Sequence, residues 1–148
     1  MQKLLDFRNQ ELDRQKNTLA ALQGEKKHIE EAREMLVQKV VEEGEQLQRV
    51  YQFGAAASEI AVRKRYIVTL QQEIHLKEHQ ALEKQQEIEK QLGVVVEATK
   101  DVRTLEKLEE KQLEEYNFKA NKENEQFIEE FVSGQTVRAS SAVNEQGA

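Results

Sequence analysis

The sequence predicts an all-α protein: a long antiparallel two-helix coiled-coil hairpin over residues 1–132, followed by a disordered polar tail over residues 133–148. An apolar residue recurs at every seventh position of one stretch, at Ile60, Ile67, Ile74, Ala81, Ile88, Val95 and Val102. Such a repeat keeps one seam of a helix facing a partner helix over many turns. The 148 residues include no Pro, so nothing interrupts a long helix. Hydrophobic residues make up 38% and charged residues 34%, which is enough for a thin seam and too little for a thick globular core.

The main alternative to a coiled coil is intrinsic disorder, because Glu, Gln and Lys dominate the composition. A disordered chain has no reason to keep a heptad period over seven repeats, so the coiled coil is favoured.

The first helix is expected over about residues 2–52, where a second heptad runs. Its apolar seam positions are Leu5, Leu12, Leu19, Leu22, Ile29, Leu36, Val40, Leu47 and Val50. Polar residues interrupt the same seam at Arg8, Gln15, Lys26, Arg33 and Glu43. Polar layers in a coiled coil cost stability but help to fix the register and the choice of partner.

The tip of the hairpin is expected at about residues 53–58. Gly54 is a plausible helix terminator, and Ser58 a plausible N-cap with Glu59 in the following first turn. The alternative is one uninterrupted helix that dimerises, because Ala55, Ala56 and Ala57 are strong helix formers. The hairpin is favoured because the two seams are similar in kind and meet here.

The second helix is expected over about residues 59–132, longer than the first, and to end at Ser133 and Gly134. Its last part, residues 111–132, therefore has no predicted cover, although it contains apolar side chains at Leu113, Tyr116, Phe118, Phe127, Ile128, Phe131 and Val132. These residues form a docking surface, or they cover the start of the first helix near Phe7.

Several function classes are disfavoured by composition. The chain has no Cys, and its net charge of −6 comes without a basic stripe for nucleic acid or a basic amphipathic face for a membrane. It shows neither a transmembrane span nor a signal peptide, so a cytoplasmic protein without direct membrane insertion is expected. A Gly-rich phosphate loop and a Ser/His/Asp set are also absent from the sequence, so neither a cofactor nor enzymatic activity is expected.

One motif resembles a metal site. His75, Glu78 and His79 match the H-x-x-E-H pattern of one class of zinc peptidases. With Ile74 on the seam, both histidines lie on the outward side of the helix, and a catalytic zinc needs a third ligand and a shaped cavity. A chance match is favoured over a metal-dependent hydrolase.

Three stretches resemble the FliJ family of the flagellar type III export apparatus. They are the opening QKLLDFR (residues 2–8), RYIVTLQQEI (residues 65–74), and RTLEKLEEKQLEEY (residues 103–116) with the later Glu129, Glu130 and Phe131. The likeness covers about residues 2–132.

This resemblance implies a non-enzymatic stalk and general chaperone that inserts into the hexameric export ATPase and promotes its assembly and hydrolysis. It also implies contacts with the membrane-embedded export gate and with export chaperones, in the cytoplasm at the inner membrane. The ATPase-ring contacts would be Leu105, Leu108, Leu113 and Tyr116, and the gate contacts Tyr66 and Leu70. Glu73 and Lys77 depart from the residues that relatives carry. An injectisome stalk protein and an unrelated coiled-coil scaffold remain alternatives.

Overall fold

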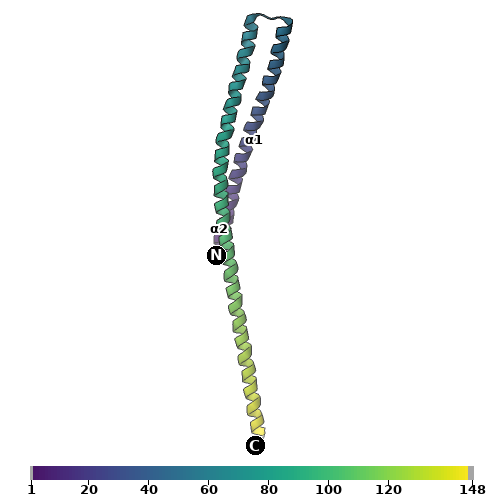
Figure 1. The fold of residues 1–148 in the computed structure, drawn as a ribbon. Helices are drawn as coiled ribbons and strands as arrows, with labels where there is room; N and C mark the ends of the chain where they lie inside the picture. Colours follow the sequence, from purple (N-terminus) through teal and green to yellow (C-terminus); the bar gives the residue numbers. More distant parts are fainter. Residues whose placement is uncertain (1, 147–148) are drawn as a thin grey trace. The chain divides into compact units, whose positions relative to one another are not determined.

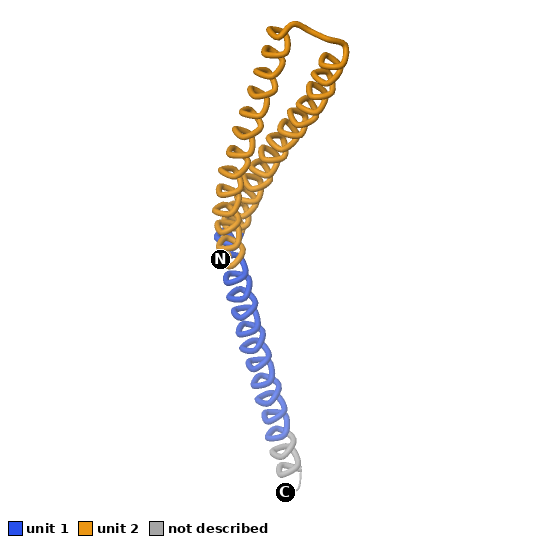
Figure 2. The backbone as a smooth tube through the Cα atoms, turned by 45° about the horizontal axis from the view of Figure 1, so that its top comes forward, with its two compact units in different colours: residues 1–5, 102–148 blue, residues 6–101 orange. Residues whose placement is uncertain are grey.

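The computed structural model describes residues 2–146, which form two long α-helices: α1 (Gln2–Phe53) and α2 (Ala57–Gln146) (Figure 1). No strand occurs among these residues. The chain divides into two units, which Figure 2 shows in different colours. Unit 2 is Asp6–Asp101, and unit 1 combines residues 1–5 with residues 102–148. The predicted all-α architecture is confirmed.

Unit 2 is an antiparallel hairpin in which α1 and α2 lie side by side (Figures 1 and 2). Gln91 Nε2 donates a hydrogen bond of 2.7 Å to Gln15 Oε1, and Lys26 Nζ donates one of 2.8 Å to Gln85 Oε1. Nearer the tip, Arg33 Nη2 lies 2.9 Å from Glu78 Oε1. Because the residue number falls along α2 as it rises along α1, the helices are antiparallel, and the single uninterrupted helix is wrong.

The core is a thin seam that follows the predicted heptad positions and also contains Leu70, which was not predicted to lie in it. The buried hydrophobic residues are Leu5, Leu12, Leu70, Ile88 and Val102, of which Leu70 is the most buried. The other predicted apolar seam positions of both helices are half-buried. None of the described side chains is less than 2% exposed, so each layer of the seam remains close to water.

The polar layers of α1 meet polar partners on α2. Gln15, Lys26 and Arg33 are half-buried, and each forms one of the cross-helix interactions given above. Paired polar layers of this kind favour one register, which is the role predicted for them. Arg8 was wrongly predicted to lie in the seam: it is exposed, with its guanidinium 6.0 Å from the Phe7 ring centroid. Asn9 is half-buried instead, because a straight helix drifts relative to a strict heptad.

The tip turns at Gly54, whose φ of +75° is the one positive value among the described residues. An L-residue with a side chain rarely adopts this conformation, so Gly54 ends α1 as predicted. α2 begins at Ala57, and the carbonyl of Ala56 accepts the N–H groups of Glu59 at 3.0 Å and Ile60 at 3.2 Å. Ser58 is therefore inside the first turn and is not the N-cap.

The end of the second helix differs from the prediction. α2 does not end at Ser133 and Gly134 but continues through the stretch 133–146 to Gln146. This stretch has no Pro, and a single Gly costs only about 1 kcal/mol in a helix interior. Thr136 Oγ1 also donates to the carbonyl of Val132 at 2.9 Å, a bond made within the helix. Residues 147–148 lie outside the described residues.

The described helices include none that combines the length and the apolar character needed to span a membrane.

Candidate docking surfaces

The first candidate surface lies on residues 105–132 of α2, which we call the arm and which belong to unit 1. Leu105 is half-buried, whereas Leu108, Leu113 and Tyr116 are exposed. Further along, four large apolar side chains are each more than half exposed: Phe127, Ile128, Phe131 and Val132. These side chains are candidates for a docking surface, and the alternative in which they cover the start of α1 near Phe7 stays a prediction. Phe7 is exposed as well.

The apolar side chains of the arm form a stripe with an eleven-residue spacing. Leu105, Tyr116 and Phe127 are eleven residues apart, as are Ala120 and Phe131. Eleven residues are close to three full helical turns, so each set returns to the same face of the helix. We call these five residues, with Leu113 beside them, the arm stripe.

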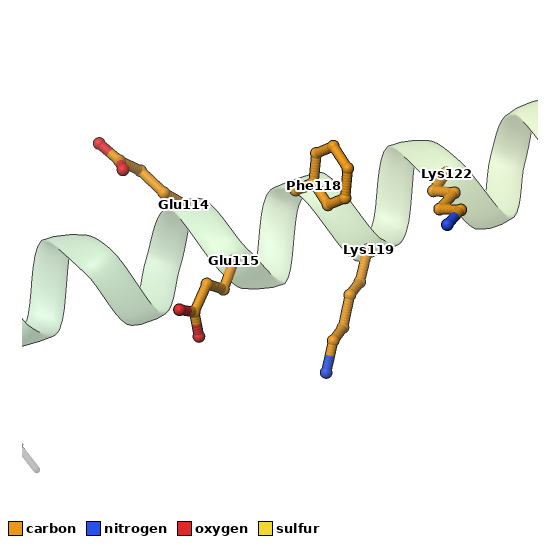
Figure 3. A pocket seen from close by; sticks show the side chains of 5 residues that line it. All are labelled: Glu114, Glu115, Phe118, Lys119 and Lys122. Carbon is orange, nitrogen blue, oxygen red and sulfur yellow. The ribbon is translucent and has the colours of Figure 1, made fainter.

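One aromatic residue of the arm, Phe118, lies on a different face of the helix from this stripe. Phe118 lies among Glu114, Glu115, Lys119 and Lys122, and Figure 3 shows that all five side chains leave a single helix. The charged side chains spread outward rather than enclosing a space. This face is therefore an open helix surface with an exposed ring, and not a cavity for a small molecule.

The arm is acidic. Its residues 105–132 contain nine Glu and four Lys. The arm stripe thus lies within a field of negative charge, which favours a partner that offers apolar contacts together with basic groups.

The two residues expected to contact the export gate lie in unit 2 and differ in exposure. Tyr66 is partly exposed, with Lys39 Nζ 5.7 Å from its ring centroid, and its hydrogen bond with Lys39 raises the pKa of that ammonium group. Leu70 is only 3% exposed and packs in the seam. Tyr66 can therefore touch a partner directly, whereas Leu70 would act on such a contact by holding the seam beneath it.

The two histidines of the H-x-x-E-H pattern each lie beside a glutamate on the surface. His75 Nδ1 lies 3.5 Å from Glu78 Oε2, and His79 Nε2 lies 2.9 Å from Glu83 Oε1. Glu78 also accepts a hydrogen bond of 3.0 Å from Arg33 Nε, which lowers the pKa of its carboxyl group. Among the described residues, no group of three metal-binding side chains comes together.

The comparison with known families decides the assignment. The family model of the flagellar FliJ protein matches residues 1–141. The chain belongs to the FliJ family. Neither a curated protein nor a solved structure matches it.

The FliJ match extends beyond the stretches that carry the resemblance in the sequence. It includes residues 133–141, the beginning of the polar stretch that continues α2. The family region therefore contains the whole hairpin and the whole arm.

Sequence reasoning missed one exposed group in this FliJ chain. Phe53 is 86% exposed beside the turn at Gly54, and Tyr51 and Val62 nearby are each more than half exposed. The available signal was an aromatic residue directly before the predicted turn glycine, where no seam position requires one.

Proposed function

We propose that this chain is a non-enzymatic stalk and assembly factor of the flagellar type III export apparatus. The arm inserts into the hexameric export ATPase, promotes its assembly and thereby its ATP hydrolysis. The observation that carries this proposal is the acidic arm with its exposed apolar side chains. FliJ family membership supports the flagellar setting.

The distribution of apolar groups around the arm favours a partner that encircles it. A single helix is marginal in water and gains most of its stability by packing an apolar face. Here the arm stripe lies on one face, where Tyr116, Phe127 and Phe131 are exposed. The exposed Phe118 lies on another face. A helix lying in a groove would cover one of these faces, whereas loops around the pore of a ring contact every face.

Binding of the arm and closure of the ring are thermodynamically linked. A shaft that binds the closed hexamer more tightly than free subunits shifts the equilibrium toward the hexamer. If hydrolysis requires the closed ring, the chain raises the rate without contributing a catalytic group. Leu105, Leu108, Leu113 and Tyr116 are the contacts that we assign to the ring.

A second contact involves the export gate and uses unit 2. Tyr66 presents its ring and its Lys39 neighbour at the surface, and Leu70 fixes the seam below. In this setting the chain is cytoplasmic and peripheral to the inner membrane, and it also acts as a general chaperone that handles free export chaperones.

The test is ATP hydrolysis by the flagellar export ATPase of the same organism, with and without this chain, together with hexamer formation. We expect both to rise with the chain present. A Leu105→Asp/Leu108→Asp variant should lose most of the stimulation and remain helical by circular dichroism.

The matched control is Leu82→Asp/Leu92→Asp, which places two aspartates at exposed leucines of the same helix within unit 2. It should stimulate as the unchanged chain does. Equal stimulation by both variants would count against the ring contact. Stimulation of an injectisome ATPase alone would move the assignment to that system.

A further inference from the structure

The tip of the hairpin is basic although the chain is acidic. We define the tip as residues 49–66, which include the loop between α1 and α2 (Figure 1). The tip carries four cations, Arg49, Arg63, Lys64 and Arg65, against the single anion Glu59. The whole chain has six more acidic than basic residues, so the remainder is more acidic still. The nearest acidic residue before the tip on α1 is Glu45.

The one acidic group of the tip is already engaged. Glu59 Oε1 lies 3.5 Å from Arg63 Nε, an ion pair that lacks the alignment of a hydrogen bond. Arg49, Lys64 and Arg65 are exposed. The exposed charge at the tip is therefore positive.

The same tip exposes aromatic and apolar groups. Phe53 is the most exposed of the large hydrophobic residues, and Tyr51 is half exposed with Lys64 Nζ 5.7 Å from its ring centroid. Val62 is exposed one turn into α2. None of these side chains occupies the seam, so the packing of the hairpin does not account for them.

We propose that the tip docks on the surface of an anionic phospholipid bilayer. Arg63, Lys64 and Arg65 are consecutive in a helix and so point about 100° apart. A flat protein surface lying along one face of the helix would meet one or two of them, whereas a bilayer met by the tip is negative across its whole plane. Phe53 and Tyr51 would sit at the level of the lipid headgroups, where aromatic side chains are favoured, with the cations at the phosphates.

This contact is peripheral and reversible. Two aromatic side chains and a few cations give weak binding, because stable anchoring takes two strong signals. The net charge of the complete chain does not reveal this site, because the basic residues are confined to the tip and are not spread along a helix face. The proposal does not rest on the ATPase contact, which other residues make.

The first experiment is co-sedimentation of the full chain with vesicles of phosphatidylcholine, with and without phosphatidylglycerol. We expect binding only when phosphatidylglycerol is present, falling as salt is added. Lys64→Gln/Arg65→Gln should weaken binding about 25-fold, because each Lys or Arg at an anionic surface contributes roughly fivefold. Arg103→Gln/Lys107→Gln removes the same two residue types from exposed positions elsewhere in α2 and should leave binding unchanged.

A second experiment reports on the tip alone. The chain contains no Trp, so Phe53→Trp and Phe118→Trp each introduce a single tryptophan, which can be excited selectively. With anionic vesicles, the tryptophan emission of the Phe53→Trp variant should shift to shorter wavelength and be quenched by brominated lipids. The emission of the Phe118→Trp variant, whose fluorophore lies on the arm, should not change.

Two results would overturn the proposal. One is an absence of binding to anionic vesicles at low salt, and the other is binding that the tip and control variants weaken equally. If the tip variant instead lost binding to an acidic protein, with no vesicle binding by the unchanged chain, the tip would be a protein-docking site.

Discussion

Helix α2 belongs to two regions that behave differently: within unit 2 its heptad residues pack against α1, whereas on the arm most of the large apolar residues are exposed. The difference lies in the period as well as in the partner. Apolar residues recur every seven residues from Ile60 to Val102 and every eleven from Leu105 to Phe127. A seven-residue repeat curves the seam around a partner helix, whereas an eleven-residue repeat does not follow that left-handed path. The change of period coincides with the boundary of the two units at Val102.

One part of α2 therefore buries its apolar residues within the chain, whereas another part needs a partner to bury them. In unit 2, polar side chains such as Gln15 and Gln91 find each other across the seam, so the hairpin specifies its own register. On the arm, the apolar residues have no intramolecular function that the structure shows. Residues exposed in this way are candidates for binding, and residues buried in the seam are candidates for stability.

The seam and the arm should differ most in how the loss of one side chain changes the free energy of unfolding. Leu70→Ala should destabilise the hairpin by about 2–3 kcal/mol, because it removes the most buried side chain and leaves a cavity. Phe127→Ala on the arm should change the free energy of unfolding by less than about 0.5 kcal/mol, because the ring is exposed. Urea denaturation followed by circular dichroism measures both. Equal losses in the two variants would mean that the arm packs against part of this chain in solution.

Substitution by alanine should have opposite effects on stability at Gly54, in the turn, and at Gly93, in the helix. Gly54→Ala should destabilise by about 1 kcal/mol, because its φ of +75° strains any other residue even though a Cβ meets nothing within 4 Å. Gly93→Ala, within α2 and equally open, should stabilise by up to about 1 kcal/mol. Thermal unfolding of the two variants gives the signs, and a stabilising Gly54→Ala would refute the tight turn.

Much of the fold was predictable because helix geometry dictates where a heptad places its side chains. Nearly every predicted seam residue, from Leu5 to Val102, is buried or half-buried. The wrong predictions concern positions where weak local effects compete. Asn9 is half-buried in place of Arg8, Ser58 lies inside the first turn of α2, and Gly134 did not end the helix.

The candidate sites were predictable only in part. The exposure of the arm followed from the unequal lengths of the two helices, since α1 has too few residues to cover α2. The resemblance supplied Tyr66 and Leu70 as a pair, but only the structure shows that Leu70 faces the seam. An exposed apolar stripe says that a partner is needed and does not say which one, so the ring and gate contacts rest on the family and on the proposed experiments.

The smallest expected effect is the loss of hairpin stability at acidic pH. It tests whether the cross-helix ion pair of Arg33 and Glu78 contributes to the free energy of unfolding. Hydrogen bonding from Arg33 lowers the pKa of Glu78 below its ordinary 4.5 in the folded chain. The unfolded chain therefore binds the proton more readily, so the contribution of this pair is present above pH 4.5 and is lost as the pH falls through the lower folded value. Glu78→Gln should remove that part of the acid dependence, and Arg33→Gln should remove most of it, because Arg33 is the largest cause of the lowered pKa. Both groups are at the surface, so the effect is small and screened by salt. Denaturation curves between neutral pH and about pH 3 at low salt measure it, and an unchanged acid dependence in both variants would show that the hairpin depends on its apolar seam alone.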